Sequence, residues 1–521
     1  MAEGYAKATR RPGVVLVSTD RPSSADMVTP MLDGLRDRTP MVVICGQESA
    51  TPETDARSHF MDRVRAYVKS RARVLRLHEL PQAMDAAFGH ATGPQPGPTI
   101  VDISPGLGDT VVDPREPDAS NGSLVVEKTD GEHRRRDGVD HRYDRIARVA
   151  DVMNQSRRPV ICAGNGVRAS VRGCQLLAKI SQKAQIPVAT TLRGLGSFDE
   201  TRDEALHTMG PHGAPYANCA IQHADLLIVA GAKLDERAVG DAEGFAPTAL
   251  DKHRGGRGIV HFDIDAAKLG KVIEPTEIIL GDLSETLRVL LSLLTPTTHR
   301  REWMEQIQRW KKPYARAGVT VPATSDHHRP QPQQVVAELD RQTTPMKSTI
   351  TITTGIDQCQ LWTSQHFRCT HPQSLITAGR PTTVGFGLPA AIGAKLARPE
   401  QQVIAVDSDT SFGTTMGELM TALQHQIPIK AIVFNGHRPR STRSEMQQSD
   451  SGGKACRESP ASLDFDRLAR SIGCRGQRCE RVDELPHAIY WLLRCRGPAL
   501  LDVATCEPDV VAMASNHAPP A

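Results

Sequence analysis

Short apolar runs recur along the chain, and each is followed by a stretch with helical spacing of its apolar residues. Such runs are typical of strands buried on both faces of a parallel sheet, which crossover helices cover. The pattern predicts an α/β protein of three doubly wound parallel sheets. The expected strands are Val14–Val17, Met41–Cys45, Thr99–Ile103, Pro159–Ala163, Pro187–Thr190, Leu226–Ala230, Ile259–Ile264, Thr349–Thr353, Val403–Val406, Lys430–Phe434 and Ala499–Val503.

Polar stretches divide these strands into three regions. The first region opens directly on a helix, Met1–Ala8, so it is expected to be a partial N-terminal domain. The predicted divisions are residues 1–115, a charged linker at 116–143, residues 144–295, a linker at 296–329 that holds one helix, residues 330–513, and a tail at 514–521. The charge run at 132–137 is either a solvated linker or a site for a phosphate or a partner.

Composition narrows the class of protein. A chain of 521 residues is too long for one core, which agrees with three domains. Aromatic residues make up 4% and the net charge of +3 is spread out, which argues against a nucleic-acid partner. No apolar run has the roughly 18–20 residues that cross a membrane. Eleven cysteines without a CxxC pair are expected to be reduced thiols.

Glycines follow the first strand of the second region, at Gly164 and Gly166. Glycines at a strand end let backbone amides approach an anionic group without hindrance from a Cβ. Such glycines are also common in simple turns. The pattern alone therefore leaves a nucleotide site and a plain turn open.

Several segments in a fixed order carry a family resemblance. They are Met1–Ala6, Pro40–Gly46, Pro96–Pro98, Thr190–Phe198 and Gly385–Gly393, supported by Gly255–Phe262 and Trp303–Lys312. In this order they resemble the acetolactate synthase large subunit of the thiamine diphosphate family, nearest to its fungal form. The resemblance extends over essentially the whole chain.

The resemblance implies a pyrimidine-binding N-terminal domain, a central FAD-type domain and a C-terminal domain that holds the diphosphate of thiamine diphosphate through Mg²⁺. It implies condensation of a pyruvate-derived carbanion with a second 2-oxo acid, as in branched-chain amino acid synthesis, with FAD in a structural role. Active sites of the family lie between two chains, so a dimer is expected. The family resemblance suggests a mitochondrial location; no transit peptide is recognisable in this chain, and a cytoplasmic location is the alternative.

The resemblance also implies the FAD contacts. Lys233 replaces an arginine of the family and loses its planar guanidinium fork. The alternative is a domain that kept its fold and lost its ligand. The implied contacts are Gly164, Gly166, Thr191, Leu192, Gly210, His212, Gly231, Lys233, Asp235, Arg237, Asp263 and Ile264.

The thiamine site departs from the family pattern at its metal and its acid. Asp409 matches one Mg²⁺ ligand, but Gly436, 27 residues later, stands where the family has a ligating asparagine. Glycine offers no side-chain oxygen, so Mg²⁺ should bind more weakly. The family's catalytic glutamate matches a position upstream of Met1, so no catalytic residue is predicted within this chain.

The diphosphate and substrate positions differ as well. Gln358 is retained as a cofactor contact, but Asp357 replaces a glycine and Cys359 a histidine. A carboxylate beside a diphosphate is repulsive. Val384 replaces the methionine that holds the cofactor bent. Other changes fall at 20–24, 57–59 and 445, and the polar stretch through 453 is expected to be disordered.

Three functions are compatible with these departures. The chain is an acetolactate synthase-like enzyme, diverged or impaired; a non-catalytic or regulatory paralogue that pairs with an intact copy; or an enzyme of specialised metabolism that reuses the cleft. In the third case Arg57, His59, Asp357, Arg380 and Arg438 would line the altered pocket.

Overall fold

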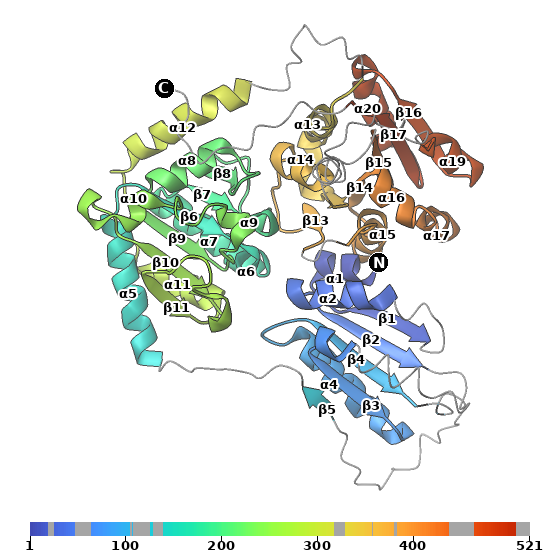
Figure 1. The fold of residues 1–521 in the computed structure, drawn as a ribbon, viewed down its shortest axis with the longest axis horizontal. Helices are drawn as coiled ribbons and strands as arrows, with labels where there is room; N and C mark the ends of the chain where they lie inside the picture. Colours follow the sequence, from blue (N-terminus) through green and yellow to red (C-terminus); the bar gives the residue numbers. More distant parts are fainter. Residues whose placement is uncertain are drawn as a thin grey trace, which may run out of the picture.

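The computed structural model describes residues 1–18, 26–46, 64–104, 107, 126–128, 139–316, 329–356, 358–379, 383–436 and 463–506. These residues form three sheets, each with helices packed on it (Figure 1). The predicted α/β class with three parallel sheets is confirmed. One edge strand of the first sheet runs antiparallel, which the sequence pattern did not predict.

The first sheet has the strand order β1-β2-β4-β3-β5. Neighbouring residues of its strands are buried against opposite cores, as in Val42 and Val43, because helices cover both faces. Strand β5 lies within the stretch that was expected to be a linker. The elements are α1 (Ala2–Thr9), β1 (Gly13–Ser18), α2 (Val28–Asp37), β2 (Met41–Gly46), β3 (Ser70–Val74), α4 (Leu80–Thr92), β4 (Pro98–Ile103) and β5 (Val126–Lys128).

The central sheet has the order β11-β10-β9-β6-β7-β8. A fully buried arginine, Arg300, donates to carbonyl groups at the C-terminal ends of α5 and α7, where helices leave carbonyls without partners. The elements are α5 (Val139–Gln155), β6 (Pro159–Ala163), α6 (Asn165–Arg168), α7 (Val171–Ala184), β7 (Val188–Thr190), β8 (Ala205–Thr208), α8 (Pro215–His223), β9 (Leu226–Ala230), α9 (Glu236–Val239), α10 (Pro247–Leu250), β10 (Ile259–Asp263), β11 (Glu277–Leu280), α11 (Leu283–Leu293) and α12 (Arg301–Arg316).

The third sheet has the order β13-β12-β14-β15-β17-β16 and is parallel throughout. Its central strands are almost wholly buried, including the threonines of β12. The elements are α13 (Pro332–Thr343), β12 (Ile350–Thr354), α14 (Gln358–His366), β13 (Leu375–Thr377), α15 (Gly387–Ala397), β14 (Gln402–Ser408), α16 (Asp409–Thr415), α17 (Glu418–Gln424), β15 (Lys430–Asn435), α19 (Phe465–Ser471), β16 (Arg475–Cys479), α20 (Leu485–Arg494) and β17 (Ala499–Ala504).

Helix α1 of the first domain packs directly on α15 of the third (Figure 1). Two glycines allow this contact. A Cβ on Gly4 would overlap the backbone of Ala390, and a Cβ on Gly393 would lie 2.9 Å from the amide nitrogen of Tyr5 and overlap the Met1 carbonyl. Backbone-to-backbone packing this close leaves no room for a side chain, so the two helices fix the first domain against the third.

Two chemical features of the described part of the chain bear on its class. No disulfide joins any two of the ten cysteines that the structure describes. Within the described ranges, no helix combines the length and the apolar composition needed to cross a bilayer.

The helix contact generates a stability prediction. Gly393→Ala should lower the free energy of unfolding by about 1–3 kcal/mol, because the new methyl group meets backbone that cannot rotate away. Gly413→Ala is the matched control, since a Cβ there meets nothing within 4 Å and alanine favours the helix. Urea denaturation measures both variants. Equal stability of the two would contradict the proposed packing.

Candidate functional site

The strand order of the third sheet reverses between the parallel neighbours β12 and β14. The strand that follows β12 in the chain, β13, lies on one side of this pair, and the strand that follows β14, β15, lies on the other. Open α/β sheets bind ligands at the carboxyl ends of the strands beside such a reversal. Gln358 begins the helix after β12, and Asp409 begins the helix after β14. Gly436 directly follows β15. Gln358, Asp409 and Gly436 therefore share one edge of this sheet. The predicted positions at 20–24, Arg57, His59, Asp357, Arg380, Arg438 and 445 lie outside the described residues.

A buried carboxylate, Asp407, lies near the carboxyl end of β14, at this edge of the sheet. A Cβ on Gly355 would overlap it, and a Cβ on Gly387 would come within 2.6 Å of its Oδ2. The Ser408 backbone amide donates to Asp407 Oδ1 at 3.0 Å. The glycines after β12 and at the start of α15 therefore accommodate a protein side chain at this point.

The metal position has one carboxylate among the described residues. Asp409 Oδ1 accepts bonds from the Thr410 amide at 2.6 Å and from its hydroxyl at 3.1 Å. Gly436 adds no side-chain oxygen. In the ranges that the structure covers, no group of three His, Cys, Asp or Glu side chains is arranged to hold a metal ion. Of the two predicted metal positions, only Asp409 carries a side-chain oxygen, whereas Mg²⁺ prefers several oxygen ligands in octahedral geometry.

The position of the predicted wedge is exposed. Val384 has 49% of its surface accessible, and it lies between two anchored neighbours. The amide of Gly385 donates to the Ser411 hydroxyl at 2.9 Å, and its φ of 81° is one that favours glycine. The Thr383 hydroxyl donates to Asp33 of helix α2. The exposed apolar side chain of Val384 therefore lies on a segment that is hydrogen-bonded to both the first and the third domain.

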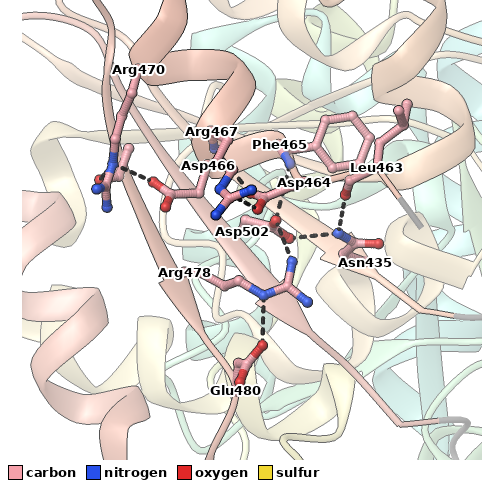
Figure 2. Close-up of polar contacts among 11 residues, drawn as sticks. Asn435, Leu463, Asp464, Phe465, Asp466, Arg467, Arg470, Arg478, Glu480 and Asp502 are labelled. Atoms are coloured by element: carbon pink, nitrogen blue, oxygen red, sulfur yellow. Dashed lines mark hydrogen bonds and ion pairs between the residues drawn. The ribbon is translucent and has the colours of Figure 1, made fainter. Parts of the chain in front are cut away.

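A polar network that the sequence did not reveal lies at the ends of β15, β16 and β17 (Figure 2). Asp502 is fully buried, and it accepts from Asn435 Nδ2 at 2.9 Å, from the Phe465 amide at 3.2 Å and from Arg478 Nη1 at 2.9 Å. Burial raises the pKa of the Asp502 carboxyl. Asn435 Nδ2 also donates to the Leu463 carbonyl at 2.8 Å. The network joins the strand end beside Gly436 to the start of α19.

The central sheet reverses its order between β6 and β9, and predicted FAD residues follow both strands. Their glycines pack on one another. The Gly166 amide donates to the Gly231 carbonyl at 2.8 Å, and a Cβ on Gly166 would lie 2.7 Å from the Gly231 Cα. A Cβ on Gly164 would overlap Ala232. Close packing of two backbone segments accounts for these glycines.

The other predicted FAD residues lie at the same edge with different surroundings. Asp235 caps α9, Asp263 is buried and accepts from the Asp265 amide, and Asn218 holds the Gly210 backbone through two hydrogen bonds. The Thr191 amide donates to Ala163, and Leu192 packs against the third domain's core. His212, Lys233 and Ile264 are exposed, whereas the Arg237 side chain lies outside the described residues.

Buried charges connect all three domains beside α1. Lys7 Nζ lies 2.8 Å from Asp37 Oδ2, 2.8 Å from Glu3 Oε1 and 2.8 Å from the Thr377 carbonyl. Arg193 of the central domain lies 2.6 Å from Asp37 Oδ1. Burial opposes charge on both groups, but Lys7 and Arg193 lower the pKa of Asp37, and Asp37 and Glu3 raise the pKa of Lys7. Both groups are therefore charged at neutral pH.

A second set of contacts reinforces this junction. Arg38 Nη2 lies 2.8 Å from Asp265 Oδ2, joining the first and central domains. Arg168 of α6 donates to the Pro372 carbonyl at 2.7 Å and to the Leu375 carbonyl at 2.6 Å. Burial lowers the pKa of Arg168 to about 10, which leaves it charged at neutral pH. The segment after β6 therefore serves as a link between domains.

Models of a known family match all three domains. The model described as thiamine pyrophosphate enzyme, N-terminal TPP binding domain, matches residues 1–67. The central-domain model of the same enzymes matches residues 146–290, and the model of the C-terminal TPP binding domain matches residues 355–503. Together with the three sheets, these matches define a protein of the thiamine pyrophosphate (thiamine diphosphate) enzyme class.

Relatives narrow the class. The chain is 40% identical to the mitochondrial acetolactate synthase catalytic subunit of Aspergillus candidus, over 97% of this chain and 73% of that protein. It is 36% identical to the mitochondrial acetolactate synthase of Schizosaccharomyces pombe, over 98% and 76%. Identity to the isozyme 2 large subunit of Escherichia coli is 30%, over 98% and 87%. The chain belongs to the acetolactate synthase family, which confirms the resemblance seen in the sequence.

The buried junction predicts a large effect of one carboxylate. Asp37→Ala should destabilise the chain by about 3–5 kcal/mol at pH 7, because Lys7 and Arg193 would stay buried without their shared partner. Since the pKa of Asp37 is lowered, its stabilisation is present above the ordinary carboxyl pKa of about 4 and is lost as pH falls through the lowered value.

Denaturation curves of wild type and Asp37→Ala at several pH values measure this effect. Asp483→Ala is the control, because Asp483 pairs with Arg481 at the surface and screening by solvent leaves such pairs weak. Similar small losses in the free energy of unfolding for the two substitutions would contradict a large contribution of the buried junction to stability.

Proposed function

We propose that this chain is an acetolactate synthase-type protein whose thiamine diphosphate centre is impaired, so that decarboxylative carboligation of 2-oxo acids is diverged or lost. The observation that carries the proposal is Gly436 at the carboxyl end of β15. It follows the strand next to the one that precedes Asp409, at the edge where the family resemblance places the metal, and it has no side-chain oxygen to offer. Losing one of two side-chain ligands weakens a site for Mg²⁺ because this ion tolerates little distortion.

The surroundings of the diphosphate support the same proposal. Asp357 adds negative charge where the family has a glycine. Cys359 is buried, and its thiol donates inward to the Ile356 carbonyl at 2.9 Å. It therefore does not take over the role of the family's histidine as a donor to phosphate. Repulsion from one residue and a missing donor at the other both disfavour a bound diphosphate.

FAD binding in the central domain belongs to the proposal. At this edge of the central sheet, the side chains of Lys233, Ile264 and His212 are exposed to solvent. A ligand there has to contact these side chains, because the glycine segments behind them already pack together. Flavin absorbance of the purified chain tests this part.

The names of the relatives support proposals on partners and location. Relatives named catalytic or large subunits suggest assembly as a homodimer, or as a heterodimer with an intact paralogue, and association with a regulatory subunit. Relatives from Aspergillus candidus and Schizosaccharomyces pombe are named mitochondrial. We propose the same compartment for this protein, with a small 2-oxo acid as the ancestral substrate.

Restoring the missing oxygen tests the metal argument. Gly436→Asn should tighten binding of thiamine diphosphate in the presence of Mg²⁺ by about tenfold or more, a change typical of altered metal surroundings. The substitution can be accommodated, because a Cβ there would lie 2.8 Å from the Thr505 hydroxyl, which can rotate, and 3.6 Å from the Thr505 carbonyl oxygen, an ordinary contact distance. Isothermal titration calorimetry measures the affinity of both proteins.

Two controls separate the metal from general effects. Asp409→Ala in the Gly436→Asn background should abolish the gain, and Gly413→Asn, placed in open space, should produce none. Micromolar affinity of the unaltered chain, unchanged by Gly436→Asn, would show that the centre is intact.

A further inference from the structure

Asp33 is a carboxylic acid without an obvious reason to be buried. It lies on α2 and is fully inaccessible to solvent. Its Oδ2 accepts a hydrogen bond from the Thr383 hydroxyl, whereas its Oδ1 has no hydrogen-bond partner within the described residues. A buried carboxylate oxygen without a partner is costly, and the cost is much smaller for a neutral carboxyl.

The charges around Asp33 favour the neutral form as well. Glu3 and Lys7 of α1 and Asp37 of α2 act on it, and Arg193 pairs with Asp37. Glu3 and Asp37 disfavour a further negative charge on Asp33, and Lys7 opposes them. The positive charges of Arg193 and Arg168 act on Asp37.

Thr383 connects this group to the thiamine edge. It directly precedes Val384, and Gly385 after it is fixed by Ser411. The third domain holds the segment through the hydroxyls of Ser411 and Thr415 on Gly385, and the first domain holds it through Asp33 and through Lys7, whose Nζ lies 5.0 Å from the centroid of the Phe386 ring.

We propose that Asp33 is a positioning residue: with a proton on its carboxyl it holds Thr383, and thereby Val384, against helix α2, and without that proton it releases them. As an account of the cofactor wedge, this inference rests on the proposed function. The coupling of Asp33 to the segment stands without a cofactor.

The direction of the effect follows from linkage. Burial, assisted by Glu3 and Asp37 and opposed by the Thr383 hydrogen bond and Lys7, raises the pKa of Asp33 to about 6. In an opened segment the carboxyl is hydrated and titrates near its ordinary value of about 4. The proton is therefore bound more tightly in the closed form, so the stabilisation of that form is complete below about pH 4 and is lost as pH rises through about 6.

Hydrogen–deuterium exchange of the complete, cofactor-free chain tests this inference. In wild type, the opening equilibrium of the peptide that covers residues 383–387 should rise by about tenfold between pH 5 and 7.5, after correction for intrinsic exchange. Asp33→Asn mimics the protonated group and should give equal protection at both pH values. Asp466→Asn, a buried acid of α19, should behave as wild type does.

The result that overturns the inference is a wild-type opening equilibrium that does not change with pH. A pH dependence that persists in Asp33→Asn would overturn it equally. Should Asp33→Asn fail to fold, the wild-type profile at 383–387, compared with strand β15 as an internal reference, decides the question. Failure of thiamine diphosphate to bind would contradict only the role of Val384 as a wedge. The exchange result would still test the coupling of Asp33 to residues 383–387.

Discussion

The tight contact of α1 with α15, and the buried charges beside it, constrain how all three domains are placed. Gly4 and Gly393 let the helix backbones meet, and Lys7, Asp37 and Arg193 then bring one charged group of the central domain to the same point. Desolvated charges of this kind are tolerated only when each has its partner. The arrangement therefore specifies one relative position of the sheets, and with it which strand ends face each other.

The residues that hold the fold together and the residues that would contact the cofactor differ in how closely they follow the family pattern. Two buried carboxylates hold the thiamine edge together: Asp407 lies against two glycines, and Asp502 connects Asn435 to the start of the next helix. The groups that would touch the cofactor are the altered ones, with Gly436, Asp357 and Cys359 in place of a ligand, a cradle residue and a donor. A fold under general decay would lose buried carboxylates first, because each is costly once a partner is missing. Under the proposed function, relaxed or redirected use of the site would produce this difference.

Sequence patterns predicted the fold well because parallel strands are apolar on both faces; the expected runs Pro159–Ala163 and Leu226–Ala230 coincide with β6 and β9. Strands with polar positions escaped, as in β3, whose arginines alternate with buried residues, and β16 at a sheet edge. The buried polar contacts of Asp407 and Asp502 were not predicted, although an acidic residue within or beside an apolar strand is the sequence signal that indicates such contacts. Asp33 and Thr383 are 350 residues apart, so only the folded chain brings them together.

Formation of acetolactate from pyruvate tests the central claim most directly. The purified chain, supplied with thiamine diphosphate, Mg²⁺ and FAD, would be followed by product analysis over hours, beside an intact acetolactate synthase. An impaired centre predicts no acetolactate above the reaction without protein. Turnover in the ordinary enzymatic range of about 1–10³ per second would contradict it.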